Sequence, residues 1–408
     1  MNTAAAPSSS LSVRQVLLCG AMIVTLSMGI RHGFGFWLQP VIMERGWTRE
    51  TFSFAMAVQN LSWGIAGPVA GMLADRFGAW KVLVAGGLLY ALGLLLMAVA
   101  SHPLSFTLSA GVLIGIAQSG STYAVIYGVL GRTVSPEKRS WAFGVAAAAG
   151  SFGQFIMIPV ETWLISHLGW QGALYLLAGA ALLILPLALG VRERSVAAFS
   201  GTHQSIGQAL REAFGYRSFQ LLMLGYFVCG FQVVFIGVHL PSYLRDHGLG
   251  LGVSTGALML IGLFNIFGTY AAGMLGQRFP KRYLLSAIYG LRAVAIVIFI
   301  SVPLTPLSVY IFAAVIGFLW LSTVPPTNAV VAQIFGAQHL SMLGGFVFFS
   351  HQIGSFLGVW LGGRLYDATG SYDVVWWLAV GLGVVAMLAN LPVREAPILR
   401  VQPGTAAA

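Results

Sequence analysis

The sequence predicts an all-α membrane protein with twelve transmembrane helices in two pseudo-symmetric six-helix bundles. Three observations predict this fold: the composition, the number of long apolar segments and an internal repeat. Of the 408 residues, 58% are hydrophobic and only 8% are charged, whereas soluble domains carry about 25% charged residues. This composition excludes a soluble enzyme and a disordered chain. The net charge of +10 does not indicate nucleic-acid binding, because the basic residues lie in short segments between apolar runs.

Twelve apolar segments are each long enough to cross the membrane, since a helix needs about 20 residues to span the hydrocarbon core. The first six are residues 15–39, 51–74, 81–100, 105–130, 140–162 and 170–190. The second six are residues 218–244, 254–277, 283–301, 306–331, 339–362 and 373–392. Glycine and proline are frequent within them, which membrane helices tolerate because neighbouring helices satisfy the freed backbone groups.

Small residues at helical spacing predict where helices approach closely. Gly111 and Gly115 form one such pair, and Gly354, Gly358 and Gly362 form a longer stripe. Both cysteines of the chain lie inside apolar segments and show no metal-binding spacing. We therefore expect neither a metal site nor a cofactor.

The distribution of Lys and Arg predicts the orientation. With the N-terminus in the cytoplasm, fifteen of the 21 basic residues fall in cytoplasmic segments and four in outer segments, as the positive-inside rule requires. We expect cytoplasmic tails at 1–14 and 394–408, six-helix bundles at 15–190 and 218–393, and a cytoplasmic linker at 191–217. Residues 205–214 of the linker are expected to form a short surface helix.

The two halves repeat each other. A Gly-Met-Leu sequence begins at Gly71 after the second span and recurs at Gly273 after the eighth, at an offset of 202 residues. Pro40 and Pro241 are 201 residues apart, and a Gly-Ser-Phe sequence recurs at an offset of 204. Two similar six-helix halves are typical of secondary transporters, whose substrate site lies between the halves near the membrane midplane. Neither a channel nor a membrane enzyme needs this duplication.

The loop after the second span carries a specific signature. Residues 71–81 read G-M-L-A-D-R-F-G-A-W-K, which resembles the cytoplasmic-loop motif G-x-L-x-D-R-x-G-R/K of the major facilitator superfamily. This resemblance implies that the glycine lets helices two and eleven pack closely, and that charged residues hold the cytoplasmic gate shut. The expected gating residues are Gly71, Asp75, Arg76, Lys81 and Arg278.

A second motif resembles one branch of that superfamily. Residues 138–151 read K-R-S-W-A-F-G-V-A-A-A-A-G-S, which is similar to the helix-five signature K-R-x-L-A-x-G-x-A-x-A-G of monocarboxylate porters, with Trp141 in place of leucine and one extra residue before the glycine. The sequence around Arg31, G-I-R-H-G-F-G-F, resembles bacterial members of the monocarboxylate porter and oxalate–formate exchanger branch. The resemblance implies a small organic anion as substrate, often moved with a proton, and a location in the bacterial inner membrane.

The chain also departs from that branch. Animal members carry an Asp and an Arg four residues apart in helix eight, where this chain has Asn265 and Thr269. The oxalate–formate exchangers carry a basic residue in helix eleven, where the nearest candidate is His351. These differences bear on which anion is carried.

Arg31 is the strongest candidate for a substrate ligand. An ionised side chain at the bilayer centre costs at least ~2.5–3.5 kcal/mol unless it faces water or a partner, and a guanidinium can bind a carboxylate through two parallel hydrogen bonds. The alternative interpretations are that Arg31 snorkels or pairs with Glu161, the only acidic residue that lies within a predicted span rather than at its first position. Gln232 is the corresponding residue of helix seven, because each lies nine positions before its proline, and both are expected to face the pseudo-axis.

Three histidines, His32, His239 and His351, lie well within the spans. His239 shares a helix face with Gln232, seven residues earlier, and histidine titrates near pH 6.5, so it can couple transport to protons. The alternatives are a gate residue near the outer mouth for His239, and structural hydrogen bonds for His32 and His351.

Tyr123 and Tyr127 share one face of helix four and either donate hydrogen bonds to a carboxylate or pack against neighbouring helices. The candidate substrate-binding residues are Arg31, Tyr123, Tyr127, Gln232, His239, Asn265 and His351. The candidate proton-coupling residues are His32, His239, His351 and Glu161.

The sequence therefore predicts a secondary transporter of small organic anions, above all monocarboxylates, that works by alternating access and proton symport. Anion exchange is left open, because Arg31 alone could prevent the empty carrier from turning over. Two other functions compete: an exporter of drugs or metabolites, which usually needs an acid in the first, fourth or seventh span, and a transporter-like ligand sensor, which needs a large soluble extension. We expect a monomer in the lipid bilayer that is not an enzyme and binds no nucleic acid.

Overall fold

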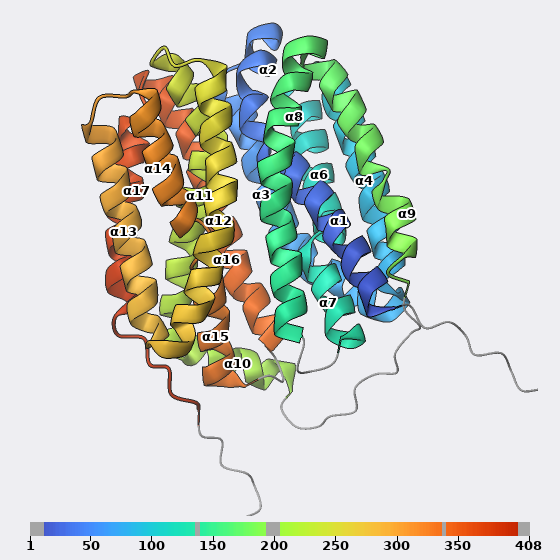
Figure 1. Cartoon of the computed structure of the whole chain (residues 1–408), viewed down its shortest axis with the longest axis vertical. Coiled ribbons are helices and arrows are strands. Elements are labelled where there is room, and N and C mark those ends of the chain that lie inside the picture. Colours follow the sequence, from blue (N-terminus) through green and yellow to red (C-terminus); the bar gives the residue numbers. More distant parts are fainter. Residues whose placement is uncertain (1–11, 135–138, 193–204, 337–339, 399–408) are drawn as a thin grey trace, which may run out of the picture.

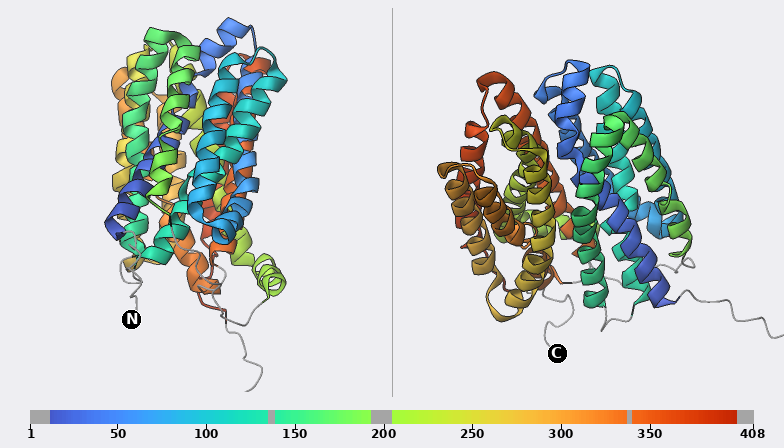
Figure 2. Two further views of the ribbon diagram at one scale, coloured as in Figure 1. Left: turned by 90° about the vertical axis from the view of Figure 1, so that its right-hand side faces the viewer. Right: turned by 45° about the horizontal axis from the view of Figure 1, so that its top comes forward.

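The computed structural model of the chain describes residues 12–134, 139–192, 205–336 and 340–398. These residues form helices and connecting turns, with no β-strand among them. Two groups of helices stand side by side, as Figure 1 and the right-hand view of Figure 2 show. Much of both predicted tails and of the predicted linker lies outside the described residues.

The first group begins with a crossing in three pieces, which are α1 (Val13–His32), η1 (Phe34–Phe36) and α2 (Leu38–Arg45). The second and third crossings are α3 (Arg49–Phe77) and α4 (Ala79–Val99). The fourth consists of α5 (Pro103–Phe106), the π-helix η2 (Thr107–Leu113), α6 (Ile114–Ser121) and α7 (Tyr123–Thr133). The fifth and sixth share α8 (Arg139–Ala181), which turns sharply at Gly169 (φ 70°), and end with α9 (Ile184–Leu189).

The second group follows the short helix α10 (Ile206–Gly215), which confirms the predicted linker helix and begins with the Ser205 hydroxyl accepting from the Gln208 N–H. Its first three crossings are α11 (Arg217–Asp246), α12 (Leu251–Arg278) and α13 (Lys281–Ser301). The last three are α14 (Pro306–Leu319) with α15 (Val324–Phe335), then α16 (Leu340–Thr369), then α17 (Asp373–Asn390).

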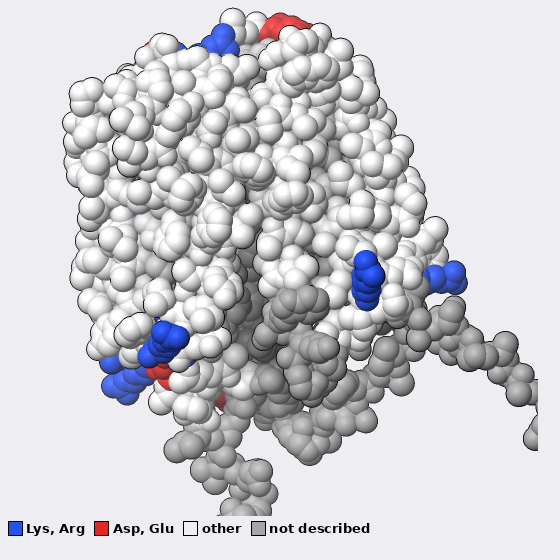
Figure 3. Space-filling view, viewed as in Figure 1, with Lys and Arg blue, Asp and Glu red and all other residues white. Residues whose placement is uncertain are grey.

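The helices are built to lie in a bilayer. Ten helical segments within the described residues are long and apolar enough to cross a membrane. One of them, of 48 residues, turns back at Gly169, and α3 adds a further helix of 29 residues, so the arrangement is consistent with twelve crossings. On the face drawn in Figure 3, charged residues lie toward the two ends of the molecule, with a broad uncharged band between them.

The predicted glycine stripes lie where helices touch. A Cβ on Gly354 would lie 1.9 Å from the Phe227 carbonyl oxygen, and one on Gly358 would lie 2.4 Å from that of Phe231, so α16 packs backbone to backbone on α11. Gly111 meets α3 in the same way, at 2.9 Å from the Ala55 oxygen. Small residues therefore set the closest helix contacts, as membrane helices require when no hydrophobic force drives their association.

Four crossings are interrupted within their apolar spans, which the hydropathy pattern did not predict. The breaks lie between α1 and α2 at Gly33, between α6 and α7 at Thr122, between α14 and α15 at Trp320, and between α8 and α9 at residues 182–183. At the third break, Arg292 of α13 donates from Nε to the Leu319 oxygen (3.0 Å) and from Nη2 to the Trp320 oxygen. Broken helices are tolerated at membrane depth where buried partners satisfy their backbone.

The two groups are locked together at the end that carries α2, which we call the latch end (Figure 1). Arg49 at the start of α3 binds Asp246 of α11 at 2.7 Å and donates to the Tyr372 hydroxyl at 2.9 Å. The backbone N–H of Glu50 donates to Asp367 of α16 at 2.6 Å. Carboxylates at a helix N-terminus are favoured by its dipole. These charged contacts join α3 to the other group and close the latch end.

A histidine supports the latch from inside. The His239 Nδ1 accepts from the Tyr372 hydroxyl at 2.9 Å, and its Nε2 donates to the Val359 oxygen at 2.9 Å. Burial raises the pKa of the Tyr372 phenol, so the hydroxyl stays protonated as a donor. His239 therefore occupies the position of a gate residue, one of the two roles expected for it.

The groups separate toward the opposite end, where α10 lies, which we call the linker end. On α3, Gly64 still packs on Gln352 of α16, but Gly67 and Gly71 have open space around them, as does Gly345 of α16. The close packing of Gly71 that the loop motif implied is therefore absent in this conformation. The interface is closed at the latch end and open at the linker end.

Within the part of the chain that the structure describes, no hydrogen bond or ion pair joins Arg76, Lys81 or Arg278 to the opposite group. Arg76 is exposed and its guanidinium lies 5.3 Å from the Phe77 ring centroid. Lys81 and Arg278 are also exposed, and the Asp75 side chain lies outside the described residues. An open linker end accounts for this, because the motif is expected to hold that end shut only when it closes.

Candidate functional site

A cavity lies between the two groups, beneath the latch. Its volume is about 40 Å³, which is room for about three water molecules. Helices α1, α3 and α8 of the first group and α11, α12 and Trp320 of the second line it. The cavity therefore occupies the place between duplicated halves where a transported molecule binds.

Arg31 is the charged group of this cavity. It stands two residues before the break at Gly33, and its Nη2 donates to the Asn60 Oδ1 at 2.5 Å. Its guanidinium carbon lies 4.9 Å from the ring centroid of Trp63. These contacts hold the guanidinium in place, while its Nε has no hydrogen-bond partner. Among the described residues no acidic side chain forms an ion pair with Arg31, so its charge is uncompensated.

Two more unpaired polar atoms belong to residues that line the cavity. They are the Oε1 of Gln154 on α8 and the indole Nε1 of Trp320, both buried and without a hydrogen-bond partner. An unpaired buried polar group costs about 1–3 kcal/mol, so three around one small cavity call for an explanation. A bound carboxylate that accepts from Arg31 and Trp320 would supply partners for the two donors, while the Gln154 oxygen needs a donor such as water.

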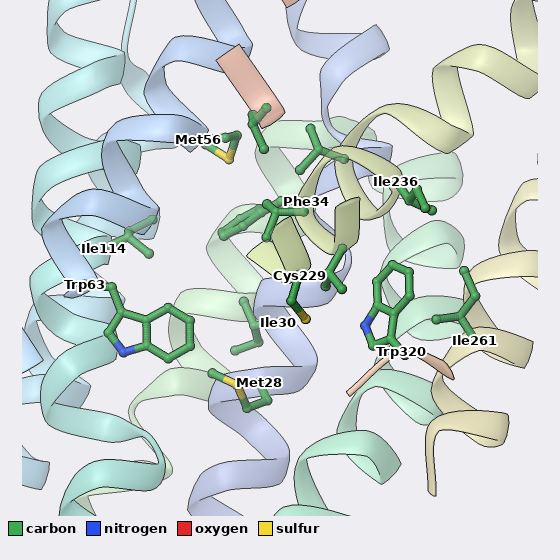
Figure 4. Packing of buried hydrophobic residues seen from close by; sticks show 14 of the residues in the cluster. Met28, Ile30, Phe34, Met56, Trp63, Ile114, Cys229, Ile236, Ile261 and Trp320 are labelled. Atoms are coloured by element: carbon green, nitrogen blue, oxygen red, sulfur yellow. The ribbon is translucent and has the colours of Figure 1, made fainter. Parts of the chain in front are cut away.

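The two walls of the cavity differ in polarity. The first group contributes its polar residues, which are Arg31, His32, Gln59, Asn60 and Gln154. Apart from the indole N–H of Trp320, the second group contributes apolar side chains and backbone, from Val233, Val234, Gly237, Val238 and Leu258. Figure 4 shows Trp63 and Trp320 on opposite sides of this region, with Phe34 between them.

The repeat explains this asymmetry once its register is known. The cavity-facing residues Arg31 and His32 correspond to Val233 and Val234 at the offset of 202 residues that the loop motif has. The proline pair suggested an offset of 201, which matched Arg31 to Gln232. One residue of register turns a helix by about 100°, so Gln232 points elsewhere.

The face of α11 that carries Gln232 and His239 packs against α17 rather than the cavity. Gln232 donates to the Ala379 oxygen at 2.9 Å, and the Phe235 and Trp376 rings meet with centroids 4.9 Å apart. That these residues share one helix face is confirmed. The expectation that Gln232 faces the pseudo-axis is wrong in this conformation, because the buried face points to a neighbouring helix of the same group.

Of the other candidate residues, Asn265 and His351 do not line the cavity, whereas His32 does. Asn265 donates to the Ser151 hydroxyl at 3.0 Å and so ties α12 to α8 of the other group. His351 is bonded to Gln352 at 3.0 Å, and its ring stacks on Phe348. His32 does line the cavity, and its Nδ1 donates to the Met28 oxygen of its own helix at 2.6 Å.

Tyr123 and Tyr127 lie side by side on α7, with ring centroids 5.6 Å apart and planes tilted by 33°. Tyr127 also packs on Phe143 of α8, at 5.0 Å. Tyr123 touches α8 at Gly150, where a Cβ would lie 1.8 Å from its hydroxyl oxygen. Both rings lie at a contact between helices of the first group.

Glu161 is fully buried, and neither of its carboxyl oxygens has a hydrogen-bond partner. The carboxyl rests on Gly33, because a Cβ there would lie 1.5 Å from Oε2. Glu161 therefore does not form the bridge to Arg31 that was one interpretation of that residue.

Comparisons with known proteins agree with this architecture. A family model described as Major Facilitator Superfamily matches residues 17–341. The chain belongs to the major facilitator superfamily. The superfamily match agrees with the loop motif at residues 71–81, and it establishes a membrane transporter rather than an enzyme.

Relatives within the superfamily include named transporters. The chain is 28% identical to bovine monocarboxylate transporter 13, over 95% of this chain and 92% of that protein. It is 24% identical to the uncharacterized MFS-type transporter YcxA of Bacillus subtilis (strain 168), over 89% of this chain and 90% of that protein. A solved D-xylose–proton symporter has the same fold, with a TM-score of 0.75, 14% identity, and coverage of 94% of this chain and 98% of that one.

The polar residues of the cavity that the sequence did not point to are Gln59, Asn60, Gln154 and Trp320. The adjacent pair of Gln59 and Asn60 inside an apolar span was a usable signal, because polar side chains at membrane depth usually face a cavity or a partner. No comparable signal existed for Trp320, since its exposure to the cavity depends on the break after α14.

Proposed function

We propose that this major facilitator transports small monocarboxylates by alternating access, with a proton as the co-transported ion. One observation carries the proposal: a membrane-embedded guanidinium without an acidic partner, with a free Nε, in a cavity between the two halves. The carboxylate binds Arg31, and the rest of the substrate lies against the valines and Leu258 of the second half. The resemblance to monocarboxylate porters and the named relatives support the same substrate class.

The linker end is proposed to face the cytoplasm, which makes the described conformation inward-facing. The excess of Lys and Arg in the predicted cytoplasmic segments supports this orientation. We further propose that the protein works as a monomer in the bacterial inner membrane. Proton symport is preferred over exchange because a co-transported proton cancels the charge of the anion, which lowers the cost of crossing the apolar interior.

The apolar second wall predicts selectivity for one carboxylate. Butyrate leaves its alkyl tail on that wall, whereas succinate places a second carboxylate there, and a charge at this depth costs at least ~2.5–3.5 kcal/mol. We therefore expect butyrate to be preferred over succinate by roughly 60- to 400-fold. Counterflow of labelled butyrate in proteoliposomes, with each compound as competitor, measures this ratio.

Two controls complete that experiment. Butyramide has the size of butyrate but no charge, so it is expected not to compete. Succinate that competes as well as butyrate would contradict the claim that the apolar wall disfavours a second carboxylate. Counterflow that is driven by cationic dyes and not by any carboxylate would overturn the proposal and favour the drug-exporter function.

A further inference from the structure

The carboxyl of Glu161 is buried between the helices of the first group. A role for it in coupling protons to carboxylate transport rests on the function proposed above. The side chain is 0% exposed, and neither oxygen has a well-formed hydrogen bond among the described residues; the donor beside it is the indole N–H of Trp37, which is likewise left without a well-formed hydrogen bond. An ionised carboxylate without partners is far too costly in a low-dielectric interior, so the group neutralises instead. Glu161 therefore holds a proton in this conformation.

The position of Glu161 ties that proton to the moving parts. Its carboxyl rests on Gly33, where the first crossing breaks. Two residues before the break is Arg31, which faces the cavity. Two residues after it is Gly35, which lies so close to α11 that a Cβ would be 2.5 Å from the Gly237 oxygen. Residues 31–35 therefore contact the cavity, the Glu161 carboxyl and α11 on the side of the closed latch end. Opening of the latch end is expected to move this segment.

The candidate histidines and the Tyr90 hydroxyl near Glu161 already have hydrogen-bond partners, whereas Arg31 keeps an unpaired Nε. His32 and His351 are each bonded through Nδ1, and His239 is bonded through both ring nitrogens. The Tyr90 hydroxyl on α4 donates to the Ser27 oxygen at 3.2 Å. The charged and titratable residues on the elements packed against α8 in this region are Arg31, His32, Tyr90, Tyr123 and Tyr127. On α12, Tyr270 and Arg278 are exposed.

We propose that Glu161 is the proton-binding site that couples proton movement to carboxylate movement. The coupling follows from charge balance between two buried groups. An empty carrier with Arg31 charged and Glu161 ionised is neutral, and so is a carrier with Arg31, the substrate carboxylate and a protonated Glu161. A carrier that holds the proton alone or the anion alone carries a net charge, which opposes its reorientation through the membrane. Proton and anion therefore cross together.

The variant Glu161→Gln tests the coupling, because the amide copies the protonated carboxyl and cannot release a proton. Its loaded form is neutral, so counterflow of butyrate is expected to stay near the wild-type rate. Its empty form keeps the uncompensated Arg31, so net uptake driven by a pH gradient is expected to fall by at least about 50-fold. Glu44→Gln is the matched control, since Glu44 is exposed on α2, and it should leave both activities unchanged.

A second measurement does not depend on the substrate. Infrared spectra of purified protein at neutral pH are expected to show the C=O stretch of a protonated carboxyl, absent from Glu161→Gln and present in Glu44→Gln. In wild-type protein, ¹³C-labelled glutamate should shift that band, which assigns it without any variant. A missing band overturns the proton site, whatever the substrate is.

The transport outcomes separate the two proposals. Glu161→Gln protein that accumulates butyrate on a pH gradient as wild type does would overturn the coupling role while leaving the carboxylate function intact. Wild-type protein that shows the infrared band but no counterflow of any carboxylate would overturn the proposed function while leaving Glu161 as a buried proton site.

Discussion

Replacing Arg31 with alanine is expected to abolish measurable binding of butyrate. Truncating one partner of a buried, hydrogen-bonded charge pair costs about 2–5 kcal/mol, which is a loss of affinity of roughly 30- to 5,000-fold. The loss falls in this range because no other Lys or Arg among the described residues lines the cavity. Ligand-induced thermal stabilisation of the purified protein measures it, and counterflow in proteoliposomes provides an independent check.

The variant Arg31→Lys separates charge from geometry. Lysine keeps the positive charge but lacks the planar fork that binds a carboxylate through two hydrogen bonds, so its affinity is expected to lie between those of wild type and Arg31→Ala. Arg45→Ala is the matched control. Arg45 lies on α2 against the Trp170 ring, 5.3 Å from its centroid, and does not line the cavity. A carboxylate that stabilises wild type and Arg31→Ala equally would show that Arg31 is not the anchor.

Replacing Arg49 with glutamine is expected to open the latch end. Arg49 is nearly buried, with 9% of its side chain exposed, and it binds Asp246 and Tyr372 while its guanidinium lies 3.8 Å from the Tyr366 ring centroid. Breaking a buried ion pair by removing one partner costs about 3–5 kcal/mol. That cost falls on the closed state alone, because the partners separate and become hydrated when the end opens. The population should therefore shift toward the open state.

Arg364→Ala is the matched control for the latch. Arg364 binds Glu50 at 2.9 Å across the same interface, but 58% of its side chain is exposed. Exposed ion pairs contribute about 0–1 kcal/mol, so this variant should leave the equilibrium almost unchanged. The pair of variants thus distinguishes burial from the mere presence of a salt bridge.

Pulsed electron–electron double resonance measures the distance between two spin labels and so reports the opening of the latch end. Labels at Met43 and Leu251 are suitable, because both residues are exposed, at 66% and 51%, and they belong to the two halves. The labelled protein would first have its free cysteines, Cys19 and Cys229, replaced by alanine. Longer distances in Arg49→Gln than in Arg364→Ala are expected. Equal distance distributions in the two variants would show that Arg49 is not the main residue that keeps the latch end closed.

Several features of the fold could be predicted from the sequence because they depend on local chemistry. The lengths of apolar runs predict the spans, since each residue of a helix adds a constant 1.5 Å. Glycines at helical spacing predicted the close helix contacts at Gly111, Gly354 and Gly358, because only a residue without a side chain allows two backbones to touch. Arg31 stood out because a charge is costly in the membrane, and its position within an apolar span was enough to show this.

The residues that surround Arg31 could not be predicted in the same way. Periodicity shows which residues share a helix face but not which neighbour that face meets, so Gln232 and His239 were placed toward the cavity when their face packs on α17. The register of the repeat mattered equally, because a shift of one residue exchanges Gln232 for Val233 opposite Arg31.

By itself the sequence determined that this chain is a duplicated bundle of membrane helices with one unusual cation inside. Only the tertiary structure decided which polar atoms are left without partners, that the latch end is closed, and that Glu161 is sealed against Gly33. The physical reason is that solvation and hydropathy act on each segment separately. The rotation and tilt of every helix, and hence every contact between segments, depend on packing against all the others.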